Sequence, residues 1–278
     1  ISRGYLWPRQ VERNGLRADD VTIDDEVLRL VLGDYTREAG VRQLERELGT
    51  LLRKAATRIA AAPEAKPIAI DDVTVRQALG RPKFFHEAAA RTVVPGVATG
   101  LAVTGVGGDV LFVEAAAMPG NGLVLTGQLG DVMKESARIA LTYVRSHAKA
   151  LGIDQRALDS EFHVHVPAGA IPKDGPSAGV TMVTAFASLL TGRPVKSSVG
   201  MTGEVTLQGR VLPIGGLKQK VLAAHAAGLT EVILPARNEA DLDDVPTDVR
   251  EQMTFHPVNS VDEVLELALG QRELAVAA

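Results

Sequence analysis

The spacing of apolar residues changes once along this 278-residue chain, and that change constrains the fold more than any other feature. Between Gly40 and Ala62 the apolar residues recur at helical spacing, as Val41, Leu44, Leu48, Leu51, Leu52, Ala55 and Ile59. Later runs such as GDVLFVEAAAM and SEFHVHVP are instead typical of strands. Residues 81–100 contain two prolines and no sustained period. The sequence therefore predicts two domains joined by a linker.

We predict an all-helical bundle over residues 1–80, which KPIAIDDVTVRQALG closes as a short strand, an aspartate cap and a short helix ending at Gly80. Residues 81–96 are the expected linker and 271–278 a C-terminal tail. Residues 97–270 mix strands and helices, which predicts an α/β (α+β) domain with mixed sheets and flanking helices. Its expected elements include a long amphipathic helix in GDVMKESARIALTYVRSHAKAL, a buried helix in SAGVTMVTAFASLLTG, a hairpin-like pair in MTGEVTLQGRVLPIGG, a helix in LKQKVLAAHAAG and a core strand in EVILP.

Composition excludes several classes of function. The chain has no cysteine, which removes disulfides, thiolate nucleophiles and cysteine metal sites together. A net charge of −4 gives no reason to expect nucleic acid as a partner. No apolar run approaches the roughly 20 residues that a membrane span needs, so no membrane is expected. The chain begins without Met, and we expect a processed product or a piece of something longer.

Ser177, in PKDGPSAGVTM, is the candidate nucleophile, and a serine hydroxyl needs a base to remove its proton. GPSAG satisfies the G-x-S-x-G pattern of a nucleophile elbow, and the acids and the histidine that would complete a triad follow in the right order, as Asp241, Asp243, Asp244 and His256. However, the preceding strand ends well before Ser177, whereas an elbow serine lies where a strand turns directly into a helix. His163 and His165 are candidate bases nearer to Ser177 in the sequence. Two histidines on one face of a strand are, however, also typical of ordinary half-buried positions, and they are only a weak indication of a metal site.

A lysine is the third candidate base, provided that burial lowers its pKa from about 10.4 by several units. GGLKQKVLAAHAAG places Lys220 beside the apolar stripe formed by Leu217, Val221 and Ala224. Lys218 falls on the flank, although Leu222 blurs the stripe. The helical period therefore favours Lys220 over Lys218 without excluding a solvated side chain.

Ser177 also opens an apolar helix, where free backbone N–H groups would stabilise an oxyanion. Asp174 is placed either to cap that helix or to take part in an active site.

These motifs resemble the proteolytic domain of the Lon family of ATP-dependent serine proteases. PKDGPSAG matches the motif of the catalytic serine, and GGLKQK matches the G-G-L-K-x-K motif whose second lysine completes a Ser-Lys dyad. By position the resemblance implies a dyad of Ser177 and Lys220. It also implies that Thr202, in MTGE, bonds the catalytic lysine, and that Asp174 and Glu114 lie near the dyad.

The first domain is similar to the lid of the ATPase module in the same family. YTREAGVRQLERELGTLLRKAA carries the matching G-V-R motif, so the resemblance implies that Arg42 is a nucleotide sensor. The sequence has no G-x-x-x-x-G-K-[ST] motif, so we expect no ATP hydrolysis by this chain alone, with ATP and Mg bound in a missing ATPase core. No cofactor or metal is expected in the chain itself. Two departures from the family pattern, Val103 and Ala168, fall near the expected substrate groove.

The resemblance implies a serine endopeptidase for unfolded, damaged or regulatory proteins, acting in cytoplasmic quality control and stress response as a homo-oligomeric, hexameric ring. Two alternatives to this protease remain open at this point. The first is a non-catalytic oligomerisation and docking fragment, in which Lys220 titrates normally. The second is a Ser-His-Asp esterase, in which His256 is essential and Lys220 is dispensable.

Overall fold

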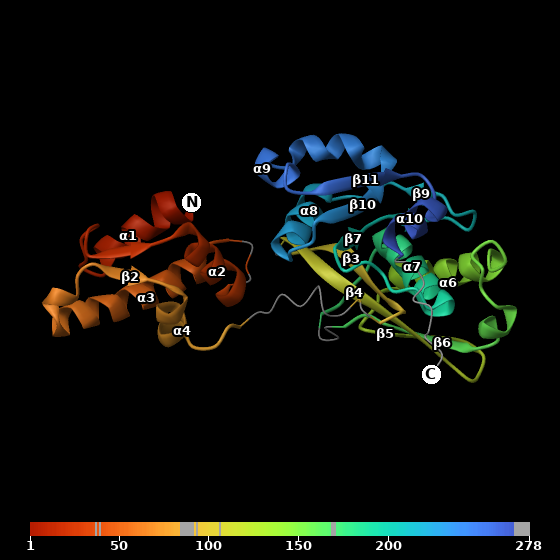
Figure 1. The fold of residues 1–278 in the computed structure, drawn as a ribbon, viewed down its shortest axis with the longest axis horizontal. Coiled ribbons are helices and arrows are strands. Elements are labelled where there is room, and N and C mark those ends of the chain that lie inside the picture. Colours follow the sequence, from red (N-terminus) through yellow and green to blue (C-terminus); the bar gives the residue numbers. More distant parts are fainter. Residues whose placement is uncertain are drawn as a thin grey trace, which may run out of the picture. The chain divides into compact units, whose positions relative to one another are not determined.

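The chain forms two compact units, Ile1–His86 and Glu87–Ala278, in the computed structural model (Figure 1). The structure describes residues 1–36, 38, 40–83, 92, 94–105, 107–167 and 171–269. Most of the predicted linker and the whole of the predicted tail at 271–278 lie outside the described residues.

The first unit is built around one long amphipathic helix. Its elements are η1 (Ser2–Leu6), α1 (Trp7–Arg13), β1 (Val21–Ile23), α2 (Asp25–Tyr35), α3 (Arg42–Ala61), η2 (Pro63–Ala65), β2 (Ile68–Ile70) and α4 (Asp72–Leu79). The apolar stripe predicted for α3 is confirmed, because Leu44, Leu48, Leu51, Leu52, Ala55 and Ile59 are all buried. The predicted cap is also confirmed, since the Asp71 carboxylate accepts a 2.7 Å hydrogen bond from Thr74 N at the start of α4.

The short strand predicted in KPIAI is confirmed as β2, but the prediction of an all-helical first unit needs one correction. Strand β2 pairs in parallel with a second strand, β1, with Val21 opposite Ile68 and Ile23 opposite Ile70. These four side chains are buried while the residues between them are exposed. The β-branched residues alternate with a period of two, so both strands bury one face against the helices.

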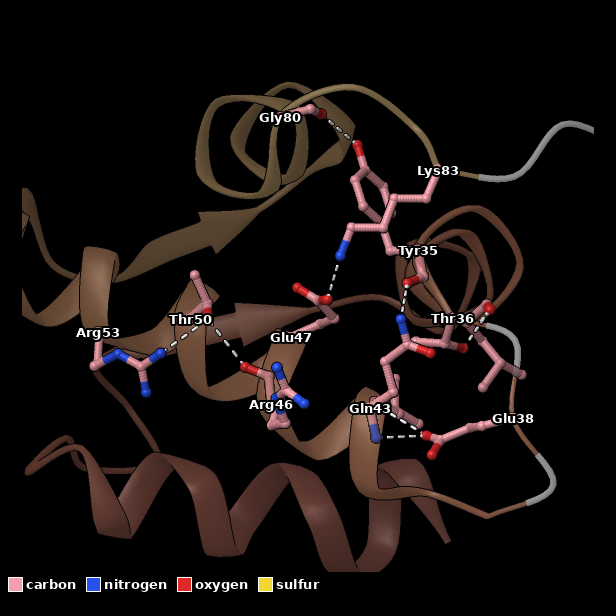
Figure 2. Close-up of polar contacts among 12 residues, drawn as sticks. Tyr35, Thr36, Glu38, Gln43, Arg46, Glu47, Thr50, Arg53, Gly80 and Lys83 are labelled. Carbon is pink, nitrogen blue, oxygen red and sulfur yellow. Dashed lines mark hydrogen bonds and ion pairs between the residues drawn. The ribbon is translucent and has the colours of Figure 1, made fainter.

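Polar contacts hold the ends of the helices of this unit together (Figure 2). The buried Tyr35, the last residue of α2, donates its hydroxyl to Gly80 O at 2.8 Å. Its own carbonyl accepts a 3.1 Å bond from Gln43 Nε2 on α3. Lys83, just beyond α4, forms a 2.6 Å ion pair with Glu47 of α3. Helices α2, α3 and α4 are therefore tied together around Tyr35.

We expect Tyr35→Phe to destabilise the first unit by about 1 kcal/mol, because Gly80 O loses its partly buried donor. The measurement is urea unfolding followed by the fluorescence of Trp7, the single tryptophan of the chain, which is buried in this unit. Tyr5→Phe is the matched control, since Tyr5 is 58% exposed. Equal midpoints for the two variants would contradict the expectation.

The second unit contains a seven-stranded mixed sheet in the order β11-β10-β7-β3-β4-β6-β5. Its strands are β3 (Val97–Thr104), β4 (Gly107–Met118), β5 (Gly122–Thr126), β6 (Glu161–His165), β7 (Val199–Met201), β10 (Glu231–Pro235) and β11 (Thr254–Val258). Strands β8 (Glu204–Val205) and β9 (Val211–Leu212) form a separate antiparallel pair, which confirms the predicted hairpin.

Helices cover both faces of this sheet (Figure 1). They are α6 (Asp131–Ser146), η3 (Gln155–Leu158), η4 (Pro176–Ala178), α7 (Gly179–Thr191), α8 (Leu217–Ala226), η5 (Ala236–Asp244), α9 (Thr247–Arg250) and α10 (Val261–Ala268). Val113 and Ala115 of β4 pack in the core built with α6 and α7, whereas Phe112 packs with α8. Because side chains alternate along a strand, α7 and α8 lie on opposite faces. The predicted α/β (α+β) fold with mixed strands and flanking helices is confirmed.

Candidate active site

Ser177 lies in the short 3-10 turn η4, directly before α7. Its backbone is fixed to the chain that follows β7, because Ser177 O accepts a 2.9 Å bond from Gly203 N. Gly203 O in turn accepts a 3.1 Å bond from Val180 N, in the first turn of α7. The chain between β6 and η4 separates Ser177 from the strand, so this is not the direct strand-to-helix geometry of an elbow.

Lys220 lies on α8 and is only 2% exposed, whereas Lys218 is exposed. The placement beside the stripe of Leu217, Val221 and Ala224 is confirmed, because all three are buried with Lys220. Burial disfavours the charged ammonium and lowers the pKa of Lys220 to about 8. A lysine with this pKa is about one-tenth neutral at pH 7, which is enough to supply a base.

Thr202 connects the lysine with the serine turn. Its side chain is fully buried, and its hydroxyl oxygen accepts a 2.9 Å hydrogen bond from Lys220 Nζ. The same hydroxyl donates a longer bond of 3.4 Å to Ser177 O. The predicted contact between Thr202 and the lysine is therefore present. Within the described residues, Lys220 Nζ bonds to Thr202 and not to the Ser177 hydroxyl.

Asp174 caps a helix, but not the one that the sequence suggested. Its Oδ1 accepts hydrogen bonds of 2.9 Å from Met133 N, in α6, and from Gly175 N. Helix α7 begins only at Gly179 and has no side-chain cap, because the turn η4 separates Asp174 from it. No local pattern indicates this pairing, nor the one made by Ser136 of α6, whose hydroxyl donates to Pro176 O at 3.3 Å.

Glu114 and the two strand histidines lie along β4 and β6. Glu114 is paired with His165 and is half-buried, on the same sheet face as Phe112 and therefore as α8. No contact among the described residues joins it to Ser177 or Lys220. His163 and His165 both lie within hydrogen-bond distance of Thr126 Oγ1, at 2.9 and 2.7 Å.

The residues of the alternative triad are engaged elsewhere. His256 Nε2 lies 3.0 Å from Glu231 on the neighbouring strand, and Glu231 also accepts a bond from Ser198. Asp241 accepts from Asn238, and Asp243 pairs with Arg250. Of the contacts in the described part of the chain, none brings these residues to Ser177.

Arg42 and the two departures complete the predicted positions. Arg42 is the exposed first residue of α3, at a helix end whose next N–H groups, those of Gln43 and Leu44, are held by the Glu38 carboxylate. Val103 is 48% exposed and packs beside Gly216, the residue that precedes α8. Ala168 lies outside the described residues.

Two family models match successive parts of this sequence. The model of the C-terminal proteolytic domain of Lon protease (S16) matches residues 69–271, more than half of the chain. This chain belongs to the Lon protease family. The matched region carries the serine, the lysine and the threonine described above. The model of the Lon protease AAA+ ATPase lid domain matches residues 12–68.

Curated Lon proteases match nearly the whole chain. The Lon protease of Salinispora arenicola is 63% identical over 276 residues, which is 99% of this chain and 35% of the relative. That of Mycolicibacterium smegmatis is 61% identical over 270 residues, which is 97% of this chain and 35% of the relative. The chain thus spans about a third of the length of these Lon proteases.

Among the described helices, none combines the length and apolar composition that crossing a bilayer requires.

Proposed function

We propose that this chain is the peptide-hydrolysing part of a Lon-type protease, with Ser177 as nucleophile and Lys220 as general base. The observation that carries the proposal is the bond between the buried Lys220 and Thr202, since Thr202 also bonds the backbone of Ser177. A buried lysine with a pKa of about 8 is otherwise a cost to the fold, and such groups concentrate at functional sites.

The proposed reaction proceeds through an acyl-enzyme. Neutral Lys220 takes the proton of Ser177 Oγ as this oxygen attacks the peptide carbonyl carbon, and backbone N–H groups around the Ser177 turn stabilise the oxyanion. The ammonium of Lys220 then protonates the leaving amine. In the second half Lys220 takes a proton from water as the water oxygen attacks the ester carbon. The ammonium then returns this proton to Ser177 Oγ as the ester C–O bond breaks, which regenerates the serine hydroxyl and the neutral lysine. The serine and lysine side chains need to approach only when substrate binds, because catalytic hydrogen bonds often tighten at that step.

The lid match supports a wider role in a longer protein. We propose that an ATPase core outside this chain binds ATP and Mg and drives unfolded or damaged polypeptides to Ser177 in a cytoplasmic, hexameric ring. The exposed guanidinium of Arg42, a planar cation with several N–H donors, is chemically suited to a nucleotide phosphate. Bound nucleotide would supply the unfolding work, whereas the cleavage chemistry remains with Ser177 and Lys220.

Ser177→Ala is expected to lower the hydrolysis of a short, unstructured fluorogenic peptide by about 10³-fold or more, because the nucleophile is lost. A short peptide is the right substrate, since it needs no unfolding. Ser197→Ala is the matched control, because Ser197 is exposed and outside the site. A Ser177→Ala variant that retains the wild-type rate would reject the proposal.

A further inference from the structure

Helix α6 begins at a residue that cannot cap it. Its N-cap is Gly130, which has no side chain to accept the free N–H groups of the first turn. The acceptor comes instead from Asp174, 41 residues after Met133, whose N–H it binds at 2.9 Å. Met133 is the third residue of the helix, and its N–H is one of those that an N-cap side chain ordinarily takes. The loop before Ser177 therefore supplies the cap of α6.

The side chain of Asp174 fills the space that a side chain on residue 130 would need. A Cβ on Gly130 would lie 2.3 Å from Asp174 Cγ and 2.4 Å from its Oδ2, which is far inside van der Waals contact. The backbone of Gly130, at φ −71° and ψ 174°, is open to any residue. The glycine is therefore required by space and not by backbone conformation, and the space is filled by the carboxylate.

Further bonds fasten the same loop to the same helix end. Gly130 N donates to Lys173 O at 2.7 Å, and Lys173 N donates to Gln128 O at 3.0 Å. Gln128 has a φ of +58°, a left-handed conformation that costs free energy in a non-glycine residue and is held here by these bonds. One turn further along α6, Ser136 Oγ donates to Pro176 O. The chain from Lys173 to Pro176 is thus fixed on α6, and Ser177 is the next residue.

We infer that Asp174 and Gly130 are positioning residues for Ser177, which they hold in place by seating its loop on the N-terminus of α6. This inference rests on the proposed serine–lysine mechanism. A direct role for Asp174 on the lysine is disfavoured by the contacts, because within the described residues its carboxylate binds backbone N–H groups and not Lys220. A carboxylate beside Lys220 would also raise the pKa of that lysine, whereas burial is what sets it.

Four variants of the full chain test the inference. Asp174→Ala removes the carboxylate. Gly130→Ala keeps the carboxylate, but the added methyl group occupies the space in which it lies. The exchange variant Gly130→Asp/Asp174→Gly moves the carboxylate to the N-cap of α6, which restores the cap without the tie to the loop. Asp131→Ala is the matched control, because it removes one negative charge from the first residue of α6, where the side chain is fully exposed.

Two readouts separate positioning from capping alone. The first is the hydrogen-exchange rate of the Met133 amide, which is expected to rise about tenfold in Asp174→Ala and Gly130→Ala and to return towards wild type in the exchange variant. The second is the kcat and KM of peptide hydrolysis. We expect kcat to fall by about 10- to 100-fold in all three variants with little change in KM, because a misplaced nucleophile slows the chemical step. The control should match the wild type in both.

Three results would overturn the inference. The first is a wild-type kcat in Asp174→Ala, and the second is an exchange variant that regains both amide protection and kcat, which would make Asp174 a cap and nothing more. The third is a shift of the pH–rate midpoint to lower pH in Asp174→Ala, the sign expected when a carboxylate acting on Lys220 is removed. Failure of the mechanism itself is distinguishable, because it would appear as full activity in Ser177→Ala while the Met133 amide stays protected.

Discussion

A Lys220→Met variant is expected to be inactive and yet more stable than the wild type. The variant lacks the proposed base, so peptide hydrolysis should fall by about 10³-fold or more. Keeping a lysine with a pKa of about 8, against a usual 10.5, costs the folded state about 3 kcal/mol at neutral pH. Methionine fills similar space without a charge, so the variant avoids this cost. The loss of the hydrogen bond to Thr202 destabilises the variant by about 1 kcal/mol and offsets part of that gain. The free energy of unfolding should therefore rise by about 2 kcal/mol.

Urea unfolding followed by circular dichroism, together with the peptide assay, measures both effects. Lys218→Met is the matched control, since it removes an exposed lysine two residues away on the same helix and should change neither quantity. A Lys220→Met variant that is less stable than the wild type, or that still hydrolyses the peptide, would contradict the assignment.

The pH dependence of stability gives a second view of the same group. Because the folded-state pKa of Lys220 lies below its unfolded value of 10.5, the unfolded chain binds more protons between about pH 8 and pH 10.5. The contribution of Lys220 to the free energy of unfolding therefore rises across this window and is flat below it. Lys220→Met should lack the rise, whereas Lys218→Met should keep it.

The sequence predicts well wherever a single helix or motif carries the information. The period of α3 locates its buried face, and the helical period of α8 separates Lys220 from Lys218. Asp71 is recognisable as a cap because its partner, Thr74, is three residues away. In each of these cases the interacting residues lie within a few turns of one element, so a local pattern records them.

Prediction fails where the partner is distant in the chain. The start of strand β3 is hidden in the sequence, because Thr99 and Gly100 lie in a stretch without a sustained period and glycine is typical of loops. At Gly100 a Cβ would lie 2.9 Å from Thr181 Oγ1 of α7, so the glycine reflects close packing of a helix on a central strand. Of the two roles considered for Asp174, capping of the helix that follows it is wrong for the same reason, since nothing near Asp174 in the sequence indicates Met133 as its partner.

Hydrolysis by the wild type is expected to increase with pH, with a midpoint near the Lys220 pKa of about 8, because only the neutral amine accepts the serine proton. Thr202→Val should move the midpoint of this pH–rate curve to lower pH and should also lower the rate on its high-pH plateau. The hydroxyl of Thr202 accepts a bond from Nζ that favours the ammonium, so its removal lowers the pKa further. The plateau of kcat/KM should fall by about 10- to 100-fold, because Lys220 and the Ser177 turn lose their shared contact.

Measuring kcat/KM of the peptide between about pH 6 and about pH 10 separates the two effects of Thr202. Thr142→Val is the matched control, because Thr142 is exposed on α6 and makes only a local bond to Arg138 O. A midpoint that stays in place while the plateau falls would mean that Thr202 only orients the lysine and that burial alone sets the basicity of Lys220. A midpoint that moves to higher pH would contradict the proposed role of its hydroxyl as acceptor.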